Sequence, residues 1–271
     1  MNFTDLILTF IVGIIEGITE WLPVSSTGHM ILFNEFFTLG FSESFYDLFL
    51  VVIQLGAILA VVMIYWSKLF PFSFKKGESF IKKDIFGLWI KILVSCVPAA
   101  IIGILFEDVF DRLFYNATSV SIALIVFGVF FILIETLNRK IPKINSISEI
   151  TLNTALLIGV FQVLAAVFPG VSRSGATIIG ALLIGVSRTV AAEYTFYLAV
   201  PVMAGASLLK LVKFGFDFSL AEFIYLAVGM VTAFVISIIA IKFLIGYVKK
   251  HDFKVFGIYR IILGILVLIL L

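Results

Sequence analysis

The polar residues best suited to chemistry lie near the start of the chain, inside an otherwise apolar segment. Glu16 and Glu20 are four residues apart, so they share one face of a helix. Two neighbouring carboxylates in a low dielectric repel each other, and they either share a proton or bind a cation. A solvated helix end is the alternative interpretation. A polar run ending in a histidine follows, with the sequence Ser25, Ser26, Thr27, Gly28 and His29.

A second polar group surrounds Arg173, about half the chain away, and its hydroxyl-bearing members are Ser172, Ser174 and Thr177. The planar fork of arginine suits phosphate oxygens, and hydroxyl groups and the N–H groups at a helix start are further anion donors. Glu16, Glu20 and Arg173 would together cost on the order of 8–10 kcal/mol inside a bilayer if they were unpaired. The combination suggests a metal-bridged phosphate group, although a transporter for an anion would carry similar residues.

These residues fall in two apolar segments that are interrupted in the middle, 3–34 and 152–190. Each has an apolar helical approach, a proline, a serine-rich turn with glycine and a second apolar stretch. A proline followed by small polar residues breaks a helix. Irregular backbone at membrane depth survives only where it is buried in protein or lines a polar cavity. We therefore expect two re-entrant helix–loop–helix hairpins.

The two broken segments also resemble each other, at an offset of 159 − 13 = 146 residues. The matching pairs are Gly13 with Gly159, Glu16 with Gln162, and Pro23 with Pro169, and SSTG (25–28) matches SRSG (172–175) after one insertion. Each half then holds one hairpin and three spans, and an odd number of spans turns the second half upside down. We expect an inverted repeat, about 1–140 and about 150–271, whose broken segments meet near the bilayer middle. Chance similarity of two turns is the alternative.

The composition places the site in a membrane. Of the 271 residues, 62% are hydrophobic and 13% are charged, whereas a soluble domain averages about 45–50% and about 25%. The mean hydropathy is +1.21. These values exclude a disordered chain, a disulfide scaffold and an ordinary cytosolic enzyme, and they indicate one all-α polytopic membrane domain over 1–271. The net charge of +2 gives no reason to expect nucleic acid as a partner.

The positions of the charges predict the topology. We expect six full spans, at 45–66, 86–106, 118–137, 193–214, 222–246 and 254–271. No Lys or Arg precedes Lys68, so we expect the N-terminal end to face outside. The basic loops 67–85, 138–150 and 247–253 should be cytoplasmic, and the acidic loop 107–117 should be outside. Near the second broken segment, we expect Glu193 to pair with Arg188.

The motifs closely resemble those of one known family. The string EGITEWLPVSSTGH (16–29) resembles the first signature of bacterial undecaprenyl pyrophosphate phosphatases of the bacitracin-resistance type, and PGVSRSGAT (169–177) resembles the second. The strings VVIQLGAILAVV (51–62), GVSR (185–188) and LAVPVMAGA (198–206) are also similar, so the resemblance covers most of the chain.

The resemblance implies an enzyme of the bacterial cytoplasmic membrane that removes the terminal phosphate of a C55 isoprenoid pyrophosphate. It implies an active site open to the outer side and a divalent cation, magnesium or calcium. The expected partners are the polyprenyl pyrophosphate, membrane lipid and, in a homodimer, a second copy of the chain. By similarity the functional set is Glu16, Glu20, Ser26, His29 and Arg173, surrounded by Ser25, Thr27, Ser172, Ser174 and Thr177.

Chemistry suggests a role for each member of that set. Glu16 and Glu20 would hold the cation that bridges phosphate oxygens, and Arg173 would stabilise charge on the transferred phosphoryl group. Ser26 would be the nucleophile and His29 its base or the activator of a water, with attack by His29 or directly by water as alternatives. A transporter or lipid flippase for a phosphorylated substrate is the competing function, because it uses the same inverted-repeat architecture.

Overall fold

The computed structural model describes residues 2–75, 77, 79–137, 141–215 and 217–271. The side chains at 107, 108 and 111 lie outside the described part, as do positions 76, 78 and 138–140 of the expected cytoplasmic loops. The described residues form α-helices and one short 3-10 helix, η1 (Ile147–Glu149), and no strand beyond two isolated β-bridges. The described part of the chain is therefore all-helical, as the composition predicts.

Five helices are long and apolar enough to cross a membrane: α3 (Glu43–Ile64), α5 (Lys83–Phe114, of which Lys83–Phe106 forms the span), α6 (Ala117–Leu137), α9 (Arg188–Phe214) and α10 (Leu220–Val248). They correspond to five of the six expected spans. The sixth, expected at 254–271, is α11 (Lys254–Leu270), whose 17 residues fall short of the roughly 20 that a bilayer core needs. Helix α5 also continues through most of the expected loop 107–117, because no glycine or proline occurs there.

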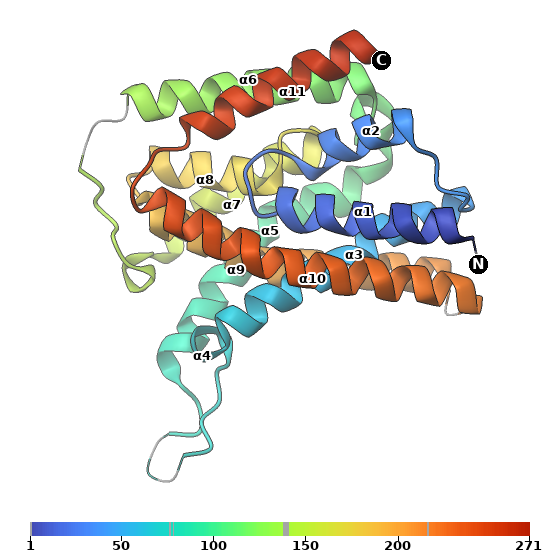
Figure 1. Ribbon diagram of the computed structural model, residues 1–271. Coiled ribbons are helices and arrows are strands. Elements are labelled where there is room, and N and C mark those ends of the chain that lie inside the picture. Colours follow the sequence, from blue (N-terminus) through green and yellow to red (C-terminus); the bar gives the residue numbers. More distant parts are fainter. Residues whose placement is uncertain (1, 76, 78, 138–140, 216) are drawn as a thin grey trace.

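The two interrupted segments form paired short helices. The first comprises α1 (Phe3–Thr19) and α2 (Ser26–Phe36), and the second comprises α7 (Leu152–Val167) and α8 (Arg173–Leu183). Each break contains the proline and the serine-rich turn that predicted it, at Pro23 and Pro169. A one-turn helix, α4 (Trp66–Leu69), begins the excursion between α3 and α5 that projects away from the other helices in Figure 1.

The two halves of the chain pack crosswise. Helix α1 packs on α10, and α7 packs on α5, so each first broken helix lies against a helix of the other half. Helices α6 and α11 run side by side, and α3 packs on α9 (Figure 1). Gly13 permits the first contact, since a Cβ there would lie 2.8 Å from the Cβ of Thr232. At Gly159 a Cβ would overlap the carbonyl oxygen of Ser95 on α5.

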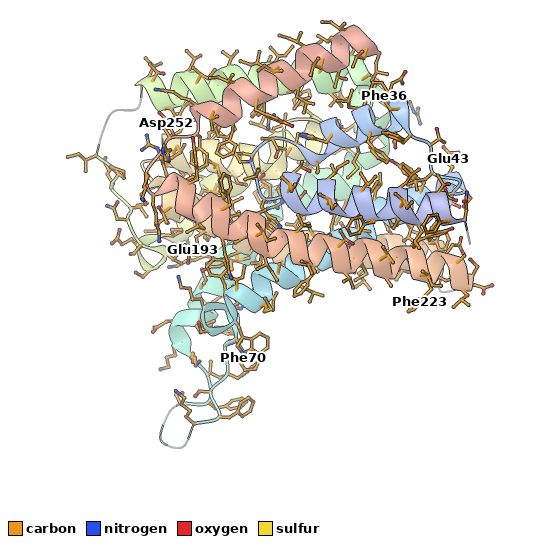
Figure 2. All side chains as sticks on the ribbon, in the orientation of Figure 1. Phe36, Glu43, Phe70, Glu193, Phe223 and Asp252 are labelled. Carbon is orange, nitrogen blue, oxygen red and sulfur yellow. The ribbon has the colours of Figure 1, made fainter. Side chains whose placement is uncertain are left out.

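The helices end at two opposite faces, and the polar residues between them are surrounded by apolar side chains. Figure 2 shows Phe36, Glu43 and Phe223 at one end of the helical layer and Glu193 and Asp252 at the other. Both chain termini lie at the Glu43 end (Figure 1). In the largest buried cluster, Trp21 is fully buried and meets Phe196 edge-on at 5.4 Å, next to the first break.

Candidate active site

A serine in an unusual backbone conformation begins the helix after each break. Ser25 and Ser172 have φ angles of 72° and 70°, and among the described residues they are the only non-glycine residues with positive φ. Such a conformation costs on the order of 1–3 kcal/mol. The Oγ of each serine accepts a hydrogen bond from the backbone N–H three residues later, at 3.4 Å from Gly28 and 3.3 Å from Gly175. The two turns therefore have the same backbone geometry, and each one caps the helix that follows it, α2 or α8.

An ion pair joins the two turns. The Nη2 atom of Arg173 lies 2.8 Å from Oε1 of Glu20, and the two side chains are only 12% and 11% exposed. The Nη1 atom of Arg173 donates to the carbonyl oxygen of Thr195 on α9 at 2.9 Å. The polar segment with the paired glutamates, in the first half of the sequence, therefore contacts the polar segment around Arg173, in the second half.

The Glu20 carboxylate also accepts a hydrogen bond from Ser26. Ser26 Oγ donates to Oε2 of Glu20 at 3.2 Å, and Ser174 Oγ donates to the main-chain carbonyl of Glu20 at 3.3 Å. Ser26 makes no hydrogen bond to His29 in the described residues, although both residues lie in the first turns of α2. The serine hydroxyl therefore faces a carboxylate rather than the imidazole.

His29 is held through both ring nitrogens. Nδ1 lies 2.7 Å from the carbonyl oxygen of Ser25, and Nε2 lies 2.7 Å from Oη of Tyr259 on α11. Because a carbonyl oxygen only accepts, Nδ1 carries the proton, and Nε2 of the neutral ring accepts from the tyrosine hydroxyl. The two rings are nearly parallel, with an interplanar angle of 11°. The remaining lone pair of His29 is therefore at Nε2.

Glu16 is the residue of this group whose polar atoms are least satisfied. Its side chain is 2% exposed and neighbours Glu20 and Arg173, yet its Oε1 atom has no hydrogen-bond partner. No cluster of three or more His, Cys, Asp or Glu side chains occurs in the described residues. Two carboxylates nevertheless suit magnesium, which is commonly held by one or two carboxylates together with substrate phosphates and water. The orphaned oxygen and the carboxylate chemistry fit a divalent cation.

The remaining predicted residues surround this centre in different ways. Ser172 and Ser174 exchange a hydrogen bond between their hydroxyl groups at 3.0 Å. Thr177 is fully buried and bonds to the carbonyl of Arg173 at 2.9 Å and to the hydroxyl of Thr195 at 2.9 Å, so it supports the arginine rather than facing a ligand. Thr27 is half-buried in the first turn of α2.

Two residues on α11 join the site without being predicted from the sequence. Arg260 is fully buried and donates through Nη1 to the carbonyl of Pro23 at 3.3 Å, and through Nη2 to those of Gly170 at 2.8 Å and Val171 at 2.9 Å. It therefore ties one broken loop to the other. The sequence does contain a reason to expect a role for Arg260, because a charged residue inside the apolar run 254–271 has the same insertion cost as Arg173. Nothing in the sequence indicates the contact of Tyr259 with His29.

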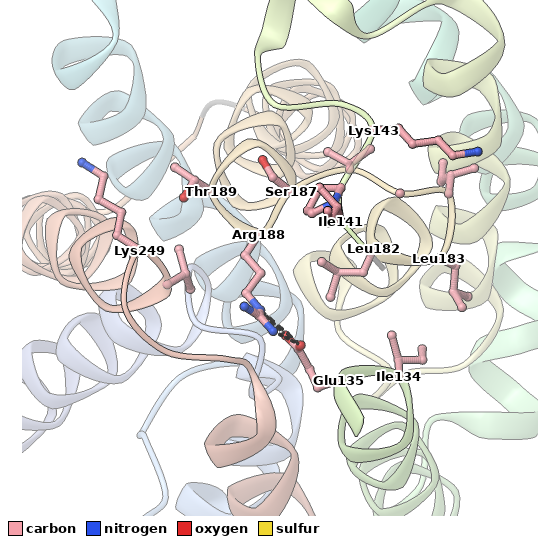
Figure 3. Close-up of a pocket in the computed structure, with 15 residues that line it drawn as sticks. Ile134, Glu135, Ile141, Lys143, Leu182, Leu183, Ser187, Arg188, Thr189 and Lys249 are labelled. Carbon is pink, nitrogen blue, oxygen red and sulfur yellow. Dashed lines mark hydrogen bonds and ion pairs between the residues drawn. The ribbon is translucent and has the colours of Figure 1, made fainter. Parts of the chain in front are cut away.

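The structure contains two cavities of similar volume, and one of them reaches the candidate site. One, of about 590 Å³, reaches from Arg173 along the gap between α5 and α9. The other, of about 640 Å³, lies at the end of the molecule that carries Glu135 and Lys249, and Figure 3 shows the Arg188–Glu135 pair inside it. The Nη2 atom of Arg188 is 2.6 Å from the carboxylate of Glu135.

The expected pairing of Arg188 with Glu193 is wrong. Glu193 lies 2.7 Å from Lys68 and accepts a hydrogen bond from Tyr197. Arg188 instead contacts Glu135 on α6, because the start of α9 faces the end of α6 across the cavity drawn in Figure 3. The prediction paired two residues that are close in the sequence, whereas tertiary packing gives each of them a partner from another helix or loop.

Comparisons with known proteins agree over almost the whole chain. A family model described as "Bacitracin resistance protein BacA" matches residues 9–266. The chain is 63% identical over 270 residues to undecaprenyl-diphosphatase 1 of Clostridium acetobutylicum, covering 99% of this chain and 98% of the relative. It is 59% identical over 270 residues to the undecaprenyl-diphosphatase of Desulfitobacterium hafniense, covering 99% and 97%. It is 59% identical over 272 residues to that of Enterococcus faecalis, covering 100% and 98%.

Proposed function

The chain belongs to the bacitracin resistance protein BacA family, and on that premise we propose that it hydrolyses undecaprenyl pyrophosphate. The reaction releases the terminal phosphate and returns undecaprenyl phosphate, the lipid carrier for peptidoglycan precursors, and it confers bacitracin resistance. The observation that carries the proposal is the Glu20–Arg173 ion pair, which joins the two serine turns inside an apolar protein. The relatives named above are diphosphatases rather than carriers, so the transporter and flippase alternative is not favoured.

Arg173 and the serine hydroxyls would bind the pyrophosphate. The guanidinium is a bidentate donor to phosphate oxygens, and it is held in place by Thr195 and Glu20. Arg173 would thereby stabilise the charge that develops on the transferred phosphoryl group. Helices α2 and α8 both begin at these turns, and N–H groups at a helix start are further anion donors.

Glu16 and Glu20 would hold a divalent cation, magnesium or calcium. Such an ion neutralises phosphate charge and orients the pyrophosphate for in-line attack. The unpartnered Oε1 atom of Glu16 supports this role, since a buried carboxylate oxygen without a donor is costly unless a ligand meets it. Glu20 would be shared between the cation and Arg173.

Ser26 and His29 would carry the nucleophilic steps. In our proposal Ser26 Oγ attacks the terminal phosphorus, its proton passes to Oε2 of Glu20, and the bond to the bridging oxygen breaks. A water then attacks the phosphoserine and gives its proton to His29 Nε2, the bond from phosphorus to Ser26 Oγ breaks, and the proton held by Glu20 returns to Ser26 Oγ. Attack by His29 or directly by water are the alternatives. Mass spectrometry of a trapped adduct separates them, because a phosphate on Ser26, on His29 or on neither marks each route.

We also propose that the fold is an inverted repeat, with the Glu43 end facing the outer side. The crosswise packing of α1 on α10 and α7 on α5 supports this, as do the matched serine turns. After replacement of Cys96 by alanine, single cysteines at Thr38 and Leu183 should be labelled from opposite sides of the membrane. Labelling of both from one side would contradict the inversion. A homodimer belongs to the same proposal, and cross-linking in native membranes measures it.

The assay for the proposed function is phosphate release from undecaprenyl pyrophosphate by the purified protein. Arg173→Ala and Glu20→Ala should abolish release, whereas Arg188→Ala with Glu135→Ala removes an equivalent ion pair from the far end and should retain it. If wild-type protein releases no phosphate, the activity is wrongly assigned. If Arg173→Ala and Glu20→Ala release phosphate as fast as wild type, the site is wrongly placed.

A further inference from the structure

The connection between α3 and α5, residues 65–82, forms a hairpin that stands apart from the other helices; we call it the α3–α5 hairpin. Phe72 and Ile81 form an antiparallel β-bridge. The backbone N–H of Ser73 donates to the carbonyl oxygen of Phe80 at 2.9 Å. Figure 1 shows the hairpin extending to the side of the helical layer, across the direction of α10, rather than beyond the ends of the helices. A lone hairpin is only marginally stable in water, so this one needs a further surface.

Aromatic rings form a continuous patch along the hairpin. Trp66 stacks on Phe70 with ring centroids 4.5 Å apart, and Phe70 meets Phe72 at 5.7 Å. The ring of Phe80 lies 5.1 Å from that of Phe72 and 5.8 Å from that of Phe74. The rings contact one another, yet Trp66, Phe74 and Phe80 are 53%, 80% and 56% exposed. A contiguous exposed apolar patch of this kind marks a surface that meets another protein or a membrane.

Lysines accompany the aromatic patch. Lys75 is exposed, Lys82 is half-buried, and the exposed Lys83 follows as the first residue of α5. Clusters of basic residues directly beside a membrane span bind anionic lipid headgroups. Aromatic residues together with lysines are the composition of elements that lie in the boundary between headgroups and acyl chains. A contact between the hairpins of two copies of the chain would place lysines against lysines, so the charge favours lipid over a second copy.

Two contacts fix the base of the hairpin where the spans end. The Nζ atom of Lys68 lies 2.7 Å from Oε1 of Glu193, near the start of α9. The indole Nε1 of Trp89 on α5 donates to the carbonyl oxygen of Leu69 at 2.7 Å. Figure 2 shows Glu193 at one end of the helical layer, together with Asp252. The hairpin therefore leaves the helices at the depth of the lipid headgroups and extends from there in the plane of the membrane.

From these observations we propose that the α3–α5 hairpin is an interfacial anchor that binds anionic lipid headgroups. Its aromatic rings enter the boundary between headgroups and acyl chains, and Lys75, Lys82 and Lys83 contact the lipid phosphates. The anchor holds the connection between α3 and α5 against the leaflet at the Glu193 end of the protein. The proposal requires only that the chain spans a membrane, so it succeeds or fails separately from the phosphatase function.

A pair of spin labels tests the position of the hairpin. In a Cys96→Ala background, Phe74→Cys places a label on the hairpin, and Lys250→Cys places the control label on the exposed turn between α10 and α11. The protein is placed in nanodiscs of phosphatidylcholine and phosphatidylglycerol. We expect the label at Phe74 to collide more with oxygen, which partitions into lipid, and the control label to collide more with a water-soluble nickel chelate.

Two outcomes of this measurement would refute the anchor. Equal access of the nickel chelate to both labels would place the hairpin in water. Exclusion of both oxygen and the chelate from the label at Phe74 would show that protein, such as a second copy of the chain, covers the hairpin instead of lipid.

A charge variant tests the choice of headgroup. With the label at Phe74, Lys75→Gln/Lys83→Gln should lower the ratio of membrane-bound to detached hairpin by about fivefold for each lysine removed, because lysines act on an anionic surface with about that strength. Lys249→Gln/Lys250→Gln removes two lysines outside the hairpin and should leave the ratio unchanged. Nanodiscs of phosphatidylcholine alone should lower the ratio for the wild-type hairpin as well. Equal ratios in the two double variants, or in the two lipid compositions, would overturn the binding of anionic headgroups.

Discussion

Replacing Arg260 with methionine should inactivate the protein while leaving it folded. The arginine is fully buried and donates three hydrogen bonds, to Pro23 in one broken loop and to Gly170 and Val171 in the other. Methionine fills similar space without a donor. The two loops that carry the Glu20–Arg173 partners would then lose their common anchor.

The magnitude follows from two opposing effects. Three carbonyl oxygens left without donors cost about 1–3 kcal/mol each, or roughly 3–9 kcal/mol together. Burying a guanidinium that has no carboxylate partner costs several kcal/mol of desolvation, so its removal stabilises the folded state by a similar amount. We therefore expect a net loss of stability below about 3 kcal/mol. Activity should fall about 100-fold, because displacement of a site by about 1 Å has that effect on catalysis.

The assay combines phosphate release with thermal unfolding in detergent. Arg260→Lys keeps the charge but lacks the planar fork, so its activity should lie between those of wild type and the methionine variant. Lys249→Met controls for the loss of a basic residue elsewhere and should behave as wild type. A folded Arg260→Met protein with activity within about threefold of wild type would refute the view that this arginine aligns the two loops.

Three further outcomes are expected. Tyr259→Phe keeps the stacked ring but removes the hydrogen bond to His29 Nε2, so the acidic limb of the pH–rate profile should move to higher pH; an unchanged profile would separate the tyrosine from the chemistry. Gly159→Val forces a side chain into the backbone of Ser95 and should lower the unfolding temperature far more than Gly246→Val, whose site is open. Chelation of divalent cations should stop phosphate release, and Glu16→Gln should raise the magnesium concentration needed to restore it; activity in chelator would exclude the cation.

Much of this architecture follows from local sequence, because hydropathy and helix breakers act over short distances. The apolar runs predicted six spans, of which five are helices long and apolar enough to cross a membrane, and Pro23 and Pro169 with their serines predicted both breaks. Helix α5 continues beyond the predicted span 86–106, because no glycine or proline follows there to stop the helix.

The site residues were predictable by type but not by partner. Glu20 and Arg173 stood out because a charge inside an apolar run needs compensation, yet their contact spans 153 residues and no local pattern encodes it. The hydrogen bond from Tyr259 to His29 spans 230 residues, and an exposed tyrosine on an apolar helix gives no warning of it. The predicted Arg188–Glu193 pair failed for the same reason, because only packing brings Glu135 to the arginine.

The crosswise packing of the two halves has a consequence for biogenesis. Glu20 leaves the ribosome 153 residues before Arg173, which at 5–20 residues per second is a delay of roughly 8–30 s. Arg260, which donates hydrogen bonds to both loops, leaves the ribosome later still. During that interval α1 lacks the α10 surface against which it packs, and its carboxylates lack a countercharge. The packing of α1 is therefore completed only when the last helices of the chain have been made.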